Sequence, residues 1–175
     1  MSGPLDRQPN LIGDLVELRP ATADDFEALF SVASDPLIWE IHPAHDRWQK
    51  PVFRKFFEDG LASGGMLVAT DRATGEVIGS SRYDLGRAEP GEVEIGWTFL
   101  ARSRWGGRYN GEMKALMLGH AFRSVERVIF LVGAANIRSR KALEKIGGYL
   151  TPREHRAVMA GKPVVHVIYA IDRPL

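Results

Sequence analysis

The stretch EVEIGWTFLARSRWGGRYNGEMKALMLGHAF, residues 92–122, decides the fold. Residues 92–100 alternate between two kinds of side chain, which predicts a β-strand with one apolar face. The apolar face comprises Val93, Ile95, Trp97 and Phe99, and the other face comprises Glu92, Glu94, Gly96 and Thr98. A glycine-rich loop follows, and residues 109–123 then have the composition of a buried helix. We therefore expect a strand, a loop and a helix in that order.

The loop, RSRWGGR at residues 102–108, has the composition of an anion-binding site. Adjacent Gly106 and Gly107 allow a tight turn and a close approach of the backbone to a ligand. The first amides of the following helix have no intrahelical partner and carry the positive end of the helix dipole. These amides and three arginines favour a phosphate-bearing ligand. The competing interpretation is an ordinary turn, and the motifs GxxxxGK[ST] and GxGxxG are both absent.

Composition limits the function classes that fit the chain. Its 175 residues are 45% hydrophobic and 26% charged, with a formal net charge of +1, so nothing global favours a nucleic-acid or membrane partner. The chain contains no cysteine, which excludes disulfides, thiolate metal sites and a cysteine nucleophile. The first residues lack the apolar core of a signal peptide, and we expect a cytoplasmic location.

The order of elements predicts an α/β fold with a mixed sheet. We expect a flexible N-terminal arm at residues 1–13 and a single domain at residues 14–175. Strands are predicted at residues 15–19, 66–70, 77–83, 92–100, 127–132, 149–155 and 164–171, and helices at 22–33, 51–61, 109–123 and 137–146. The arm and the irregular segment 38–46 are candidate surfaces for a homodimer.

From residue 15 to residue 171 the chain resembles the GNAT superfamily of acyl-CoA N-acyltransferases. The family loop reads Q/R-x-x-G-x-G/A, and residues 103–108 occupy its place. Gly106 matches this pattern, whereas Ser103 and Arg108 depart from it.

Two further segments resemble the branch of ribosomal-protein N-terminal acetyltransferases, the RimJ/RimL type. One is the run from Glu94 to Trp97, followed by Trp105-Gly106 and Tyr109-Asn110. The other is N-x-x-S-x-x-A-x-x-K-x-G, at residues 136–147. The resemblance implies a mixed, mostly antiparallel central sheet with splayed fourth and fifth strands and helices on both faces.

The resemblance also implies that acetyl-CoA is the co-substrate and that its pantetheine arm lies between the splayed strands. The residues placed along the arm are Phe99, Leu100 and Ala101. Those placed around the pyrophosphate are Arg104, Trp105, Gly106, Gly107, Arg108 and Tyr109. Asn136 contacts the pantetheine amides, caps the following helix, or does both.

Glu94 is the candidate general base, because an attacking amine must lose its proton and a carboxylate can accept it directly or through water. Gly96 beside it leaves room for a substrate. The alternatives are a solvent-facing strand glutamate without a catalytic role, and Glu92 or a water molecule as the base.

Ser139 is the candidate proton donor to the departing thiolate. It shares a helix face with apolar residues, where a hydroxyl needs a partner. Many members of the superfamily have a tyrosine for this role further along the helix, and Leu143 occupies that position here. The alternative for Ser139 is a local hydrogen bond to the backbone.

The sequence therefore predicts an acetyl-CoA-dependent N-acetyltransferase that acts on a primary amine by direct attack, without an acyl-enzyme. The amine is a protein N-terminus or a small molecule. No metal is expected, since His42 and His45 lack a further ligand set. The alternative function is a non-catalytic sensor or regulatory protein that binds acyl-CoA.

Overall fold

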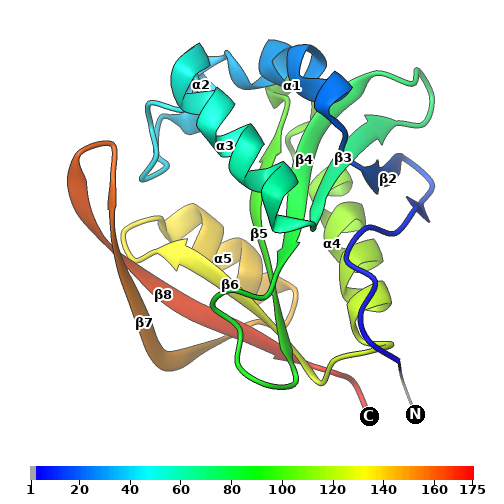
Figure 1. Cartoon of the computed structure of the whole chain (residues 1–175). Coiled ribbons are helices and arrows are strands. Elements are labelled where there is room, and N and C mark those ends of the chain that lie inside the picture. Colours follow the sequence, from blue (N-terminus) through cyan, green and yellow to red (C-terminus); the bar gives the residue numbers. More distant parts are fainter. Residues whose placement is uncertain (1–2) are drawn as a thin grey trace.

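The computed structural model describes residues 3–175, which form one mixed eight-stranded sheet with helices on both faces (Figure 1). The strands are β1 (Leu11–Ile12), β2 (Val16–Pro20), β3 (Met66–Asp71), β4 (Val77–Asp84), β5 (Glu92–Leu100), β6 (Arg127–Gly133), β7 (Tyr149–Met159) and β8 (Lys162–Asp172). The α-helices are α1 (Phe26–Ala33), α2 (Pro36–Trp39), α3 (Lys50–Ser63), α4 (Arg108–Ala121) and α5 (Ile137–Lys145). Short 3₁₀ turns cover Ala23–Asp25 and Arg102–Arg104.

The strands follow the order β1-β2-β3-β4-β5-β6-β8-β7, and among the strand pairs of residues 3–175 only β5–β6 is parallel. That pair is short, because residues 92–94 of β5 match residues 127–129 of β6 and the ladder then stops. Beyond it, β5 stays paired with β4 as far as Leu100, and β6 stays paired with β8 as far as Gly133. The two strands therefore diverge, which confirms the predicted splay. The strands expected as the fourth and fifth are β5 and β6, because β1 precedes the strand that was expected first.

Each face of the sheet has its own core. Met113, Met117 and Ala121 of α4 pack with Val93 and Ile95 on one face. On the opposite face, α1, α2 and α3 pack an aromatic cluster formed by Phe26, Trp39, Phe53, Phe56, Phe57 and Phe99. Figure 1 shows α3 in front of the strands and α4 behind them.

The prediction that the four apolar residues of β5 share one face is wrong. Trp97 has a φ of 53°, and the β4–β5 register shifts at this point, so the strand contains a β-bulge. An extra residue reverses the alternation of side chains beyond it. Val93 and Ile95 accordingly lie in the α4 core, whereas Trp97 and Phe99 pack on the α3 side.

The N-terminal segment differs from the flexible arm expected at residues 1–13, of which residues 1 and 2 lie outside the described part. Leu5 and Leu11 pack against the α4 core, and Leu11–Ile12 pairs with β2. The Arg7 guanidinium donates to the Ser63 carbonyl at 2.7 Å. Apolar contact and backbone pairing thus order a segment whose composition suggested a loose chain.

No helix within residues 3–175 combines the length and the apolar character that a membrane span requires. The helix boundaries differ from the sequence prediction by only a few residues. The main exception is α2, a single turn of helix that was not predicted. It overlaps the start of the segment 38–46, which was expected to be irregular, and ends at Trp39. Asp35 caps this turn by accepting from the Leu37 amide.

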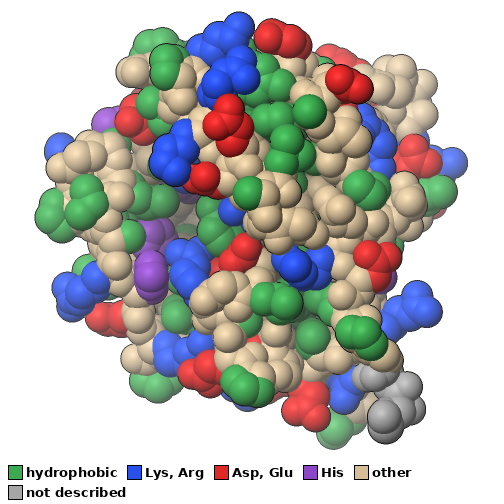
Figure 2. Space-filling model, in the orientation of Figure 1, with side chains coloured by type: hydrophobic (Ala, Val, Ile, Leu, Met, Phe, Trp, Pro, Cys, Tyr) green, Lys and Arg blue, Asp and Glu red, His purple; other side chains and the backbone are tan. Residues whose placement is uncertain are grey.

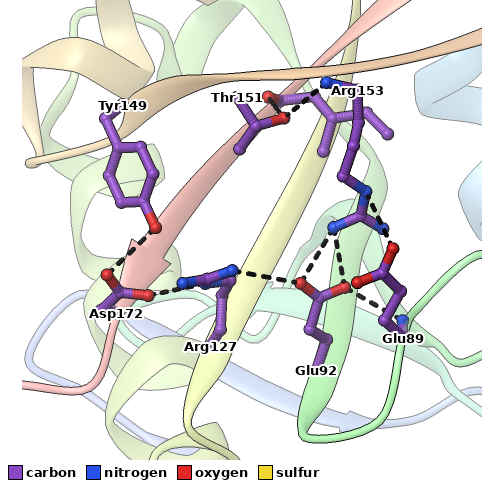
Figure 3. Close-up of polar contacts among 8 residues, drawn as sticks. Glu89, Glu92, Arg127, Tyr149, Thr151, Arg153 and Asp172 are labelled. Carbon is purple, nitrogen blue, oxygen red and sulfur yellow. Dashed lines mark hydrogen bonds and ion pairs between the residues drawn. The ribbon is translucent and has the colours of Figure 1, made fainter.

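An ionic network closes the end of the sheet where β5 and β6 pair (Figure 3). Asp172 contacts Arg127 at 2.7 Å, and Arg127 reaches Glu92 at 3.8 Å. Arg153 on β7 contacts Glu92 at 2.9 Å and Glu89 at 3.5 Å. Glu92, with a side chain only 4% exposed, is therefore a link between β5, β6 and β7.

Replacement of Glu92 by glutamine tests this network. We expect Glu92→Gln to lower the free energy of unfolding by about 2 kcal/mol, because a buried carboxylate then no longer pairs with two arginines. Urea denaturation measures the loss. Arg156→Gln on β7, the strand that also carries Arg153, is the control. The ion pair between Arg156 and Glu154 is exposed and contributes less than about 0.5 kcal/mol. Equal losses in the two variants would contradict the assignment.

Candidate active site

The divergence of β5 from β6 opens a cleft that contains two adjoining cavities, of about 460 Å³ and about 230 Å³. The larger cavity lies beside the loop that precedes α4, and the smaller one reaches between β5, β6, α4 and α5. Residues that line both cavities are His42, Thr98, Asn110, Asn136, Ser139 and Ala142. The shared lining makes the two cavities parts of one cleft.

The loop at the mouth of the larger cavity presents open backbone. Gly106 and Gly107 have φ values of 118° and 98°, which L side chains rarely adopt. A Cβ at either position would meet no atom within 4 Å, so these residues are glycine for conformation and for open space. Gly107 is the N-cap of α4, and no side chain within residues 3–175 caps this helix. The free amides fit a phosphate group.

Two of the residues that the sequence predicts to lie around a pyrophosphate form a brace behind the loop. Arg104 Nε and the Tyr109 hydroxyl both donate to Asp71 Oδ2 at 3.0 Å. Arg104 also contacts Glu76 at 3.2 Å, so carboxylates already neutralise its charge. Arg138 of α5 provides another cation, because its guanidinium stacks 4.7 Å from the ring centre of Trp105 and lines the larger cavity.

The cleft collects most of the residues selected from the sequence. The selected residues that line it are Phe99, Leu100, Arg104, Trp105, Gly106, Gly107, Asn136 and Ser139. Those that do not line either cavity are Glu94, Ala101, Arg108 and Tyr109.

Glu94 lies directly behind the cavity wall. It is 1% exposed, so the interpretation of a solvent-facing glutamate is wrong. Its two carboxylate oxygens accept from Arg87 at 3.0 and 2.7 Å. Burial raises the pKa of Glu94, and the Arg87 charge opposes that rise. A Cβ on Gly96, which lines the smaller cavity, would lie 3.0 Å from Glu94 Oε2, so the glycine leaves this carboxylate close to the cleft.

Ser139 and Asn136 meet at the start of α5. The Asn136 side chain caps the helix by accepting from the Ser139 amide at 3.3 Å, and Asn136 also lines both cavities. The Ser139 hydroxyl forms no hydrogen bond with any described residue, so the local backbone bond considered for it is not present. Leu143, at the position of the family tyrosine, lines the smaller cavity.

Sequence analysis missed Lys114, which is buried in the smaller cavity. Its ammonium donates to Thr98 Oγ1 at 2.9 Å, and burial lowers the pKa of Lys114 to about 8. No carboxylate of the described chain pairs with it. The sequence contained one signal of this burial. Lys114 follows Met113 in a helix that has apolar residues on nearly all sides.

His42 lies where the two cavities meet, and it is uncharged. Its Nδ1 accepts from the Ala44 amide at 2.9 Å. Burial and the nearby Arg47 charge lower the pKa of His42 to about 3. Within residues 3–175, no group of three or more His, Cys, Asp or Glu side chains is arranged to hold a metal ion.

Comparison with known proteins assigns the family. Residues 16–148 match the family model described as the acetyltransferase (GNAT) domain. This chain belongs to the GNAT acetyltransferases. A search of curated proteins gives no match.

Solved structures of other GNAT proteins share the whole fold. A GNAT-family protein from Chromobacterium violaceum has a TM-score of 0.83 at 20% identity, covering 98% of this chain and 89% of its own. A GCN5-related N-acetyltransferase from Brucella melitensis has a TM-score of 0.77 at 21% identity, with 95% and 79% covered. RimJ of Mycobacterium smegmatis in complex with CoA-disulfide has a TM-score of 0.73 at 21% identity, with 96% and 90% covered.

The burial of Lys114 has a consequence for the stability of this GNAT domain. The folded-state pKa, about 8, lies below the unfolded value of about 10.5, so below pH 8 the folded state carries the cost of a buried charge. Between these values the unfolded chain binds the extra proton, and stability rises with pH. We expect Lys114→Met to raise the free energy of unfolding at pH 7 by up to about 3 kcal/mol, and by much less at pH 10.5.

Urea denaturation at the two pH values measures this difference, with exposed Lys141→Met as the control. The same gain at both pH values would show that the Lys114 charge is not the cause.

The loop geometry predicts the effect of a single methyl group. We expect Gly106→Ala to weaken CoA binding about tenfold, because an L residue at positive φ costs about 1–2 kcal/mol and shifts the loop amides. Isothermal titration calorimetry measures the affinity. Gly161→Ala in the β7–β8 turn, at a φ of 76°, is the matched control and should leave the affinity unchanged. Unaltered CoA affinity in Gly106→Ala would exclude this loop as the phosphate site.

Proposed function

We propose that the protein transfers an acetyl group from acetyl-CoA to a primary amine, at a protein N-terminus or on a small molecule, by direct attack on the thioester. The observation that carries this proposal is the continuous cleft between the diverging β5 and β6. Open loop amides lie at one end of the cleft, and a buried carboxylate lies behind its wall at the other.

The binding half of the proposal assigns the loop amides of residues 106–108 to the pyrophosphate and the cleft wall at Phe99 and Leu100 to the pantetheine arm. Free backbone donors on β5, which no longer pair with β6, suit the amides of that arm. Arg104 and Tyr109 then position the loop through Asp71. The structurally similar RimJ is in complex with CoA-disulfide, which supports CoA as the ligand of the cleft.

The chemical half assigns proton removal to Glu94. The attacking amine gives up a proton through a water molecule to the Glu94 carboxylate, and its lone pair forms the new C–N bond. The raised pKa of Glu94 makes it a stronger base than an ordinary carboxylate. The Arg87 contact holds the carboxylate in place, and Gly96 keeps the path from the cavity open.

Breakdown of the tetrahedral intermediate cleaves the C–S bond and leaves a thiolate that takes up one proton. We propose the Ser139 hydroxyl as the donor, which regains its proton from solvent in the cleft, since Ser139 lines both cavities and its hydroxyl has no partner among the described residues. The Lys114 ammonium in the same cavity stabilises negative charge on the sulfur or on the intermediate. Direct attack needs no covalent acyl-enzyme; the chain has no cysteine to form one, and no recognised motif places a Ser/His pair.

Thiol release from acetyl-CoA with a panel of amines and N-terminal peptides tests the proposal. We expect Glu94→Gln to lower kcat roughly 100-fold or more with CoA affinity retained, because the proton acceptor is lost. Glu92→Gln is the control and also tests the alternative base. At temperatures where the Glu92→Gln variant remains folded, its kcat should equal that of the unsubstituted protein.

A Glu92→Gln variant that is inactive although folded, with Glu94→Gln active, would reverse the assignment of the base. Acetyl-CoA binding without thiol release across the whole panel would favour the sensor instead. The sensor is tested as a second function because Ser103 and Arg108 depart from the pattern of the family loop.

A further inference from the structure

Three arginines, Arg47, Arg82 and Arg87, gather around Trp97 and Phe56 on the α3 side of the sheet. We call them the basic cluster. The Arg82 and Arg87 guanidinium carbons lie 4.2 and 4.7 Å from the Trp97 ring centre, and the Arg47 carbon lies 4.6 Å from that of Phe56. Trp97 and Gly96 line the smaller cavity, so the basic cluster lies behind its wall opposite Lys114.

The basic cluster has more positive charge than the described chain neutralises. Arg87 pairs with Glu94, whereas neither Arg47 nor Arg82 forms an ion pair with any of residues 3–175. The acidic groups that act on them do so only at longer range: Asp84, Asp59 and Glu94 act on Arg82, and Asp46 acts on Arg47. Arg47 and Arg82 are nevertheless 8% and 5% exposed. Proteins rarely bury arginines without an anionic partner.

Two buried polar atoms, one in the basic cluster and one in the lining of the smaller cavity, also lack partners. They are Arg82 Nε and His166 Nδ1, neither of which forms a hydrogen bond within the described chain. His166 is 6% exposed and lines the smaller cavity across from Trp97. Burial lowers the pKa of His166, and the positive charges of Arg87, His155 and Arg47 lower it further, so this imidazole lies within the field of the basic cluster. Buried polar groups without partners are uncommon in native proteins and call for a ligand or water.

We propose that the amine acceptor carries an oxyanion, in the simplest case a carboxylate, that binds between the basic cluster and His166. This inference rests on the proposed acetyl transfer, because it names the class of acceptor. The guanidinium fork matches a carboxylate, and the aromatic surroundings strengthen the attraction by excluding water. Figure 2 shows a hollow on this face, between the segment after α2 and the β7–β8 hairpin, with basic and histidine side chains beside it.

Such a carboxylate has two sources, a free amino acid and a peptide with an acidic residue next to its N-terminus. Pairs of acceptors that differ only in charge distinguish them. We expect kcat/KM to be roughly 10- to 100-fold higher for 4-aminobutyrate than for 4-aminobutyramide if the acceptor is a free amino acid. The same ratio between peptides with Glu and Gln at the second position indicates a peptide acceptor.

Variants of the basic cluster test its role in this preference. We expect Arg47→Gln and Arg82→Gln to reduce the ratio at least tenfold, and Arg47→Lys to restore part of it. Arg54→Gln is the matched control, because Arg54 also stacks on an aromatic ring, at 4.0 Å from Phe26, but on the exposed side of α3. Circular dichroism shows whether each variant folds. If Arg82→Gln does not fold, the Arg47→Gln variant alone provides the test, since Arg47 lies in a loop.

The outcomes separate this inference from the proposed function. Equal rates for charged and neutral members of both pairs overturn the oxyanion site and leave acetyl transfer intact. If no acceptor is acetylated, acetyl transfer fails, and calorimetric titration of the CoA-bound protein with glutarate tests the site directly. Saturable glutarate binding that Arg47→Gln abolishes supports the site, and no binding, or binding unchanged in Arg47→Gln, overturns it.

Discussion

The structure depends on one interruption of backbone pairing. After residues 92–94 and 127–129 have paired, β5 and β6 each keep only their outer neighbour. A sheet that stayed fully paired would have no room for a ligand and no free strand amides to offer one. The β-bulge at Trp97 lies at the point where the strands separate, and it turns Trp97 away from the α4 core. The cleft between β5 and β6 follows from this geometry, and the loop before α4 lies at the mouth of its larger cavity.

The walls of the cleft hold charges that reduce the stability of the fold. Glu94, Lys114 and Arg82 are each at least nine-tenths buried, and burial shifts the pKa of each toward the uncharged form. A packed domain gains nothing from such groups unless they act on something. The contrast with Glu92 is informative, because that carboxylate is equally buried but lies in a network with Arg127 and Arg153. Both glutamates are buried and both pair with arginine, so it is the position of Glu94 behind the cavity wall at Gly96 that distinguishes the proposed catalytic glutamate from the structural one.

Local patterns predicted the order of the elements well, since strand alternation, glycines and prolines act within a few residues. Resemblance to known proteins supplied the splay, which no local pattern in β6 or β5 encodes. The face of Trp97 could not be predicted, because a bulge depends on the register with β4. Lys114 was overlooked because its role arises from burial against Thr98. The basic cluster could not be predicted either, because Arg47, Arg82 and Arg87 come from three segments that only the fold brings together.

The proposed function requires the loop amides and the free edge of β5 to hold CoA between the diverging strands. Hydrogen–deuterium exchange of the amides, with and without CoA, tests this claim most directly. We expect slower exchange at residues 106–109 and 99–100 when CoA is bound, with little change in β7 and β8. Protection confined to other segments, or none in these two at saturating CoA, would contradict it.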